Sequence, residues 1–365
     1  MCIRDSCGSS TGSTAPDVVD DLTADIEVVD TEAAEVEAVE ATATEAGNTT
    51  EESDASIIDP AFGTPVDLGL FTDGAIVSDV VTEDCTLSSD TETQCYTFTV
   101  AGFPITYDTG PFCPATIDAT ADEVGIWVDG ENLYSLDGEF IVNLADIYDD
   151  DFWMMQNEDG TVNITETAEE FELAAVPEVD ESLLNHCVEG RVEWLENGEP
   201  ITSEITIPAT PIFADSPSTG GDWGVTLDGV TIADSAPVDA ILGNYTIAAF
   251  DPCGGHYNPV DGYHVHAATG CSETSEVVDG ETAMFAIAMD GFPIHSPVGD
   301  DFTGELDECN GHETEELGYH YHANPAQDNG VLTCFSGETA ASADAGGPPA
   351  GGGGGERPAG PPPGE

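Results

Sequence analysis

The chain has almost no basic residues. Its 365 residues include three arginines and no lysine, against 74 aspartates and glutamates, so the formal net charge at pH 7 is −71. Nucleic-acid binding is excluded, because phosphates are bound by clustered lysine and arginine. Phosphoryl and sulfuryl transfer are disfavoured for the same reason, which leaves a metal ion, a protonated histidine or backbone N–H groups as cationic centres. Such an acidic surface suits a marine or salt-loving source, where salt screens self-repulsion.

Long hydrophobic runs are also missing, and none approaches the ~20 residues that a membrane-spanning helix needs. Residues 17–54 hold fourteen acids but no basic or aromatic residue, so they cannot bury enough apolar surface to fold. We therefore expect residues 7–74 to be a disordered acidic tether. By the same logic residues 339–365, rich in glycine and proline, are expected to be a disordered tail.

Two further expectations concern the first seven residues. Residues 1–6, MCIRDS, resemble a translated sequencing adapter and not protein. Cys7 then opens CGSSTGSTAPD, which resembles the mature end of a lipoprotein, so we expect a lipid anchor at Cys7 as the only contact with a membrane. The alternative is an unpaired cysteine in a disordered tail.

Eight further cysteines lie in the part expected to fold. An even set in an exported protein predicts four disulfides, and places the chain outside the cytoplasm, at the cell surface or in the periplasm. The alternative, cysteine as a metal ligand beside histidine, is weaker in an oxidising compartment. The spacing favours the pairs Cys253–Cys271, Cys309–Cys334, Cys85–Cys95 and Cys113–Cys187.

Strand patterns dominate the part expected to fold. Residues 125–133, 224–232 and 286–294 each read as a short strand, an Asp-Gly pair and a second strand, and Asp-Gly is typical of two-residue hairpin turns. A fourth hairpin is predicted around Asn197-Gly198, and helices are predicted at 139–150 and 164–176. The fold class is therefore mainly β, an antiparallel sandwich or barrel-like core that is cross-linked by disulfides and has one or two helices.

Two histidine segments share one pattern. DPCGGHYNPVDGYHVHA and DECNGHETEELGYHYHA align without a gap, 56 residues apart (309 − 253 = 56). Each follows one of the last two Asp-Gly hairpins. The sequence therefore predicts a tandem duplication of hairpin plus histidine segment over 222–338, after a β-rich N-terminal part at 75–221.

These segments, together with AMDGFPIHSP, resemble the YHYH domain family over roughly residues 85–338. The resemblance implies an exported, cysteine-containing domain and no particular biochemical activity. His295 stands where the family often has tyrosine, so we do not expect it in a shared site. Val265 replaces the second tyrosine of the motif in the first copy, so Tyr321 is not expected to be indispensable to both copies.

The histidines are the candidate metal ligands. Residues at i and i+2 of a strand face the same way, about 6.6–7 Å apart at Cα, so each pair can converge on one atom. A third histidine lies eight residues before each pair, and three neutral imidazoles form a zinc or copper site. Whether there are two sites or one shared site is left open. The predicted ligands are His256, His264, His266, His312, His320 and His322.

Acidic residues have two possible roles near metals. Asp251 and Asp307 are expected to accept the far ring N–H of the ligating histidines and so fix their tautomers. The acid-dense loops at 298–308 and 148–151 could hold calcium, although neither has the spacing of an EF-hand, and a solvated surface is the alternative.

Three functions remain open from the sequence. The first is binding of copper or zinc by the two histidine triads. The second is a metal-dependent extracellular enzyme of unknown substrate. The third is a non-catalytic cell-surface module in which the histidines only support the structure. The sequence identifies no protein partner.

Overall fold

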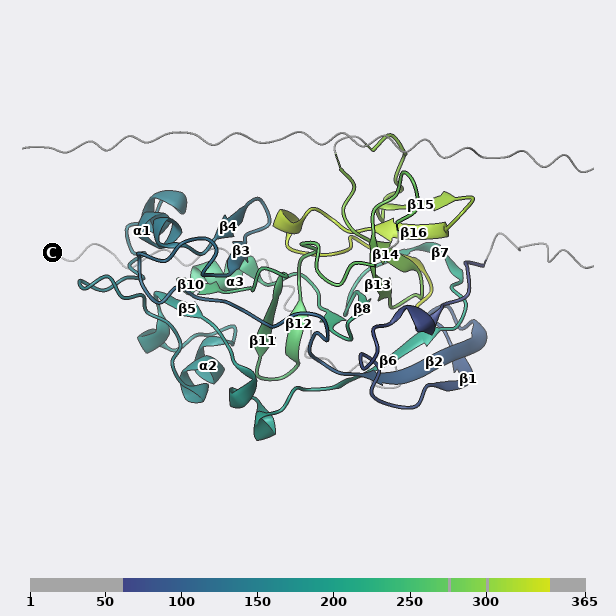
Figure 1. The fold of residues 1–365 in the computed structure, drawn as a ribbon, viewed down its shortest axis with the longest axis horizontal. Helices are drawn as coiled ribbons and strands as arrows, with labels where there is room; N and C mark the ends of the chain where they lie inside the picture. The colour runs from purple at the N-terminus through teal and green to yellow at the C-terminus, as the bar shows by residue number, and fades with distance from the viewer. Residues whose placement is uncertain (1–61, 275–276, 300–301, 342–365) are drawn as a thin grey trace, which may run out of the picture. The chain divides into compact units, whose positions relative to one another are not determined.

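The fold is organised around one eight-stranded sheet (Figure 1). The computed structural model describes residues 62–274, 277–299 and 302–341. The proposed adapter, Cys7, the tether up to residue 61 and the tail from residue 342 lie outside these residues. The described residues form seventeen strands and three α-helices, which confirms the prediction of a mainly β chain.

The order of strands in this sheet is nearly a palindrome. The two histidine hairpins occupy its opposite ends, and the two Asp-Gly hairpins meet at its centre, where β8 pairs with β13. The order is β11 (Gly255–Asn258), β12 (Gly262–Val265), β9 (Thr231–Ile232), β8 (Gly224–Thr226), β13 (Met284–Ala288), β14 (Pro293–His295), β16 (Gly318–His322) and β15 (Gly311–Thr314).

Strand pairing repeats in the two halves. In each half the Asp-Gly hairpin is antiparallel, and its second strand pairs in parallel with the second strand of the histidine hairpin, as β9 with β12 and β14 with β16. The predicted duplication is therefore present as two units related by a pseudo-twofold at the β8–β13 pair. The sheet is mixed and not purely antiparallel, because each unit must return to its own hairpin through a crossover.

A second sheet makes this a sandwich. It consists of β1 (Val81–Thr86), β2 (Glu92–Val100) and β6 (Ser203–Pro208), all antiparallel. Apolar side chains of β2 and β6, such as Phe98 and Ile207, form one buried cluster with Val225 and Ile287 from the centre of the large sheet. In the part of the chain that the structure describes, the strands do not close into a barrel, because β11 and β15 are edge strands.

Helices and short strand pairs cover the end of the sheet near β11. They are α1 (Gly138–Ile147), α2 (Ala168–Ala174), α3 (Val238–Gly243), the hairpin of β3 (Ile126–Val128) with β4 (Leu133–Ser135), and the parallel pair of β5 (His186–Val188) with β10 (Thr246–Ala248). Asp137 and Thr167 cap α1 and α2 by accepting from backbone N–H groups. Helix α1 begins within one residue of its predicted start at 139, whereas α2 begins four residues after its predicted start at 164. One further pair, β7 (Phe213–Ser218) with β17 (Phe335–Gly337), lies near the other end.

One predicted hairpin is wrong. Asn197 has a positive φ of 68°, as a turn residue should, but it lies in a 3₁₀ turn, η4 (Glu196–Gly198), which follows a second one, η3 (Val192–Trp194). Strand β6 then pairs with β2 instead of folding back on the preceding segment. Pairing with a partner about a hundred residues away overrides the local turn signal.

All four predicted disulfides are present. The pairs are Cys85–Cys95, Cys113–Cys187, Cys253–Cys271 and Cys309–Cys334, with Cα–Cα distances from 4.9 to 6.0 Å. Each of the two histidine units carries one disulfide, which joins a cysteine just before the histidine hairpin to a cysteine that follows the hairpin in the chain. Because these sulfurs are bonded to each other, the alternative that they are metal ligands is excluded.

The predicted borders of the disordered ends need correction. Residues 62–74 do not belong to the tether: the backbone N–H groups of Gly63 and Val66 donate to the carbonyls of Pro211 and Ala209, and Phe71 packs against Phe98. At the other end, residues 339–341 pair with the β1–β2 hairpin. The charge composition does not reveal these borders, because a few apolar side chains are enough to hold such short segments on the fold.

Candidate metal centres

The first centre lies at the β11 end of the large sheet. His256 on β11 is the cross-strand partner of His264 on β12, and His266 follows two residues later on the same face. The Nε2 atom of His256 lies 3.1 Å from that of His264 and 3.2 Å from that of His266. The three imidazoles predicted to form one triad therefore converge on a single point.

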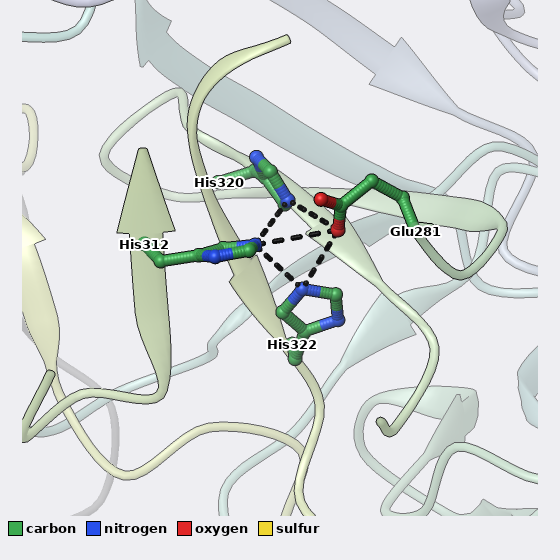
Figure 2. Close-up of side chains that lie close together, drawn as sticks. All are labelled: Glu281, His312, His320 and His322. Atoms are coloured by element: carbon green, nitrogen blue, oxygen red, sulfur yellow. Dashed lines mark hydrogen bonds and ion pairs between the residues drawn. The ribbon is translucent and has the colours of Figure 1, made fainter. Parts of the chain in front are cut away.

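The second centre repeats this arrangement at the β15 end (Figure 2). His312 on β15 pairs across the hairpin with His320 on β16, and their Nε2 atoms are 3.0 Å apart. The Nε2 atom of His322 is 3.1 Å from that of His312. The predicted alternative of one shared site is thus wrong, because the triads sit at opposite ends of one sheet.

Glu281 completes the second centre. Its Oε2 atom lies 3.3 Å from Nε2 of His312, 3.3 Å from that of His320 and 3.4 Å from that of His322 (Figure 2). Burial alone raises the pKa of this carboxyl, but the hydrogen bond with His320 and the neighbouring imidazoles lower it below its usual range. The second centre therefore offers three nitrogens and one carboxylate oxygen.

The sequence does not single out Glu281 as a ligand. It lies nine residues before Asp290 of the hairpin turn (290 − 281 = 9), and the residue nine before Asp228 in the first unit is Thr219 (228 − 219 = 9). Glu281 therefore has no acidic counterpart in the repeat, and nothing distinguishes it from the other acids of the chain. Only the folded structure shows that this loop reaches the triad.

Backbone carbonyls fix the tautomers of four histidines. In the first centre Nδ1 of His264 donates to Gly262 O at 3.2 Å, and Nδ1 of His266 donates to Asp234 O at 2.6 Å. A carbonyl oxygen can only accept, so the proton is on Nδ1 and the lone pair is on Nε2.

The second centre uses equivalent carbonyls. Nδ1 of His320 donates to Gly318 O at 3.0 Å, and Nδ1 of His322 donates to Ser296 O at 3.1 Å. These imidazoles therefore also turn an unprotonated Nε2 toward the centre. The same second nitrogen is anchored in both units, as the pseudo-twofold requires.

Burial keeps these imidazoles neutral. Desolvation lowers the pKa of His264 to about 4 and that of His266 to about 3, and it lowers the pKa of His256 well below the ordinary value. Desolvation also lowers the pKa values of His320 and His322. At neutral pH these five histidines are therefore neutral nitrogen donors, the form in which histidine binds metals.

The expectation for Asp251 and Asp307 is wrong. Neither carboxylate accepts from a histidine ring; each accepts from a tyrosine hydroxyl, Tyr263 or Tyr319, at 2.7 Å. Each also accepts the backbone N–H groups of the Cys and Gly that follow it, which shapes the turn into the histidine hairpin. Backbone N–H groups close in the sequence already satisfy these carboxylates, so the carboxylates do not accept from the histidine rings.

The other candidates do not join a centre. His295 packs against His320 at 4.5 Å between ring centroids, but its Nδ1 donates to Thr282 O and it is not among the converging donors. In the part of the chain that the structure describes, neither acid-dense loop contributes a cluster of metal-binding geometry, and Asp300 and Asp301 lie outside it.

The two centres differ in what lies beside them. A cavity of about 250 Å³ adjoins the first triad; all three of its histidines line this cavity, and the other walls are mostly apolar. The cavity beside the second centre is larger, about 540 Å³, but of that triad only His312 lines it, and most of its other lining residues are threonines and glycines together with Glu281. An aromatic ring packs against each triad: Phe250 meets His256 edge-on at 4.9 Å between ring centroids, and Phe302 meets His312 in the same way at 5.4 Å. Within the described residues no carboxylate joins the first triad, whereas Glu281 joins the second.

Comparison of the chain with protein-family models, with curated proteins and with solved structures finds no match in any of the three. Among the described residues no helix is both long and apolar enough to cross a membrane.

Proposed function

We propose that this chain is an exported metal-binding protein that holds one transition-metal ion in each of its two histidine centres. Zinc is the first candidate and copper(II) the second. Both ions are bound by imidazole and carboxylate donors, which are the donors present here.

An excess of acceptors over donors supports this proposal most strongly. In the second centre the Nε2 lone pairs of His320 and His322 and the carboxylate of Glu281 all face inward, within 3.4 Å of a neighbouring donor atom. His312 can supply at most one N–H to them. Buried acceptors without a donor are costly, and a cation at this point would satisfy all of them at once.

The first centre has the same mismatch on a smaller scale. Two Nε2 lone pairs, of His264 and His266, face the single nitrogen of His256. Protonation of the triad would also balance it, but burial lowers the pKa values of all three histidines. A purely structural role for the histidines would therefore leave an unsatisfied acceptor in both units.

The geometry of the second centre favours zinc. Zinc lies about 2.0–2.1 Å from nitrogen and oxygen donors in a tetrahedron, whose edges are then about 3.3–3.4 Å. The Oε2 atom of Glu281 is 3.3–3.4 Å from all three Nε2 atoms. In a square plane, which copper(II) prefers, one of the three would lie opposite the oxygen at about 4 Å.

Export is part of the proposal. Four disulfides are typical of proteins that mature in an oxidising compartment. The resemblance of the histidine segments to the YHYH domain family supports export as well. We propose lipid anchoring through Cys7 on the sequence context alone.

Elemental analysis tests the metal proposal. Protein made in an oxidising compartment and dialysed against zinc should carry two ions per chain. The variants His256→Ala/His264→Ala and His312→Ala/His320→Ala should each carry one. His186→Ala is the control, because His186 lies on β5 outside both centres, and it should keep two. Wild-type protein that takes up neither zinc nor copper would disprove the proposal.

A further inference from the structure

We infer that the first centre, if it holds a metal ion as proposed above, takes its remaining ligand from a small organic acid whose apolar body fills the adjoining cavity. The second centre takes no such ligand. The first copy of the motif would then bind an organic ligand, and the second copy would hold a metal ion alone.

The difference in donor number is the first observation. The second triad has Glu281 as a fourth donor, and four protein ligands complete the tetrahedral shell typical of structural zinc. The first triad offers three nitrogens, and its unit has Thr219 where the second has Glu281. Three protein ligands leave one coordination position for an exogenous donor.

The cavity supplies the second observation. The three histidines line one wall of it, and its volume of about 250 Å³ is suited to a small molecule, being below the ~300–1,000 Å³ of pockets for drug-sized ligands. Elements packed on the end of the sheet form the other walls. Their apolar side chains include Phe171, Ala174, Val188, Ala240, Ile241 and Ala248.

Charge indicates an anionic head group. Three neutral imidazoles leave a divalent ion with its full charge, so an anionic oxygen is favoured at the open position. In the part of the chain that the structure describes, Arg191 is the only arginine, and it forms an ion pair with Glu189. The metal ion would therefore be the one cation available to a carboxylate in this cavity.

The apolar walls then select the rest of the ligand. Each methylene group that leaves water contributes about 0.8 kcal/mol, or about fourfold in affinity. A carboxylate with several carbon atoms is expected to bind more tightly than acetate, and hexanoate by at least about tenfold. A site that binds the ion alone would show no such dependence on chain length.

Cobalt(II) in place of zinc provides the readout, because its visible absorption responds to a change of ligand. The variant His312→Ala/His320→Ala carries metal only at the first centre, and the variant His256→Ala/His264→Ala only at the second. Each is loaded with cobalt, its metal content is measured, and it is titrated with acetate, hexanoate and benzoate. We expect saturable spectral changes in the first variant and none in the second.

A cavity variant separates the cavity from the metal. Ala240→Trp in α3 should fill part of the space, keep the cobalt content and weaken hexanoate at least tenfold, whereas Ala240→Ser should leave both unchanged. If the His312→Ala/His320→Ala variant, whose first centre is intact, takes up no cobalt, the metal proposal for that centre is overturned. Cobalt bound there with no response to hexanoate or benzoate, or with equal affinity for acetate, would overturn this inference alone.

Discussion

The hydroxyl of Tyr321 donates to Oδ2 of Asp290 at 2.6 Å, and both side chains are fully buried. The same carboxylate accepts from the backbone N–H groups of Gly337 and Phe292. In the first unit Val265 takes the place of Tyr321, and Asp228 accepts instead from Thr106 and Ser272. Each turn carboxylate has therefore found different donors after the duplication.

Burial of Asp290 should make the stability depend on pH. Desolvation raises the pKa of this carboxyl to about 6 in the folded protein, above its ordinary value of about 3.9 in an unfolded chain. The folded state then binds more protons between these values, so the free energy of unfolding should fall as the pH rises from about 4 to about 6. The difference between these two pKa values corresponds to at most about 3 kcal/mol of stability.

Chemical denaturation of metal-free protein between pH 4 and 7 measures this slope. The Asp290→Asn variant cannot ionise there, so its slope should be shallower, although it will be less stable at every pH because an amide cannot accept all three hydrogen bonds. The strong negative charge of the chain affects both proteins alike and cancels in the comparison. Equal slopes would contradict the assignment to Asp290.

The long-range disulfide should stabilise the fold more than the short one. Loop-closure entropy predicts about 4–5 kcal/mol for Cys113–Cys187, with a sequence separation of 74, and about 3 kcal/mol for Cys85–Cys95, with a separation of 10. We expect denaturation of the two double-alanine variants to show this order. The intact mass of the wild-type protein should also lie about 8 Da below that of its reduced form, and a smaller difference would show that a pair is open.

The sequence predicted the repeated parts of this fold well. Alternating strands around Asp-Gly are local signals, and the gapless register of 56 residues indicates two segments that fold alike, so the convergence of each histidine triad could be expected. The cross-strand pairing of His256 with His264 and of His312 with His320 is seen only in the structure. Residues that act through long-range contacts could not be predicted. Glu281 has no acidic counterpart in the first unit, and residues 62–74 pack on the fold through a few apolar contacts although they follow an acidic segment.

The error at Asp251 and Asp307 has a related cause. A carboxylate near histidines in the sequence suggested a partner for the ring N–H, but the ring nitrogens find closer acceptors in the backbone at Gly262 and Gly318. These carbonyls belong to the glycines that open strands β12 and β16. Backbone acceptors have no sequence signature, so the residues that orient the imidazoles became visible only in the structure.

Zinc should stabilise the folded protein, because the converging donors exist only in the folded chain. Binding to the folded state alone contributes about 2.7 kcal/mol per site when the free ion is at 100 times its Kd. We expect the midpoint of thermal unfolding to rise on addition of zinc and to fall back on addition of a chelator. Each single-centre variant should show about half of the rise in free energy. A midpoint that does not respond to zinc would contradict binding in either centre.

Replacement of Glu281 should separate the two centres. Glu281→Gln removes a charged donor that lies within 3.4 Å of all three imidazoles of the second triad, and it leaves the first triad untouched. Changes to residues that only support a metal ligand cost about 10–100-fold in affinity, so loss of a ligand should cost at least as much. Competition with a chromophoric chelator should resolve one zinc ion bound at the wild-type affinity and one bound at least tenfold more weakly.

Glu313→Gln is the matched control, because Glu313 is exposed and directly follows His312 on β15 but does not belong to the cluster. If both variants bind two ions as tightly as the wild type does, Glu281 is not a ligand, and the second centre has the same open position as the first.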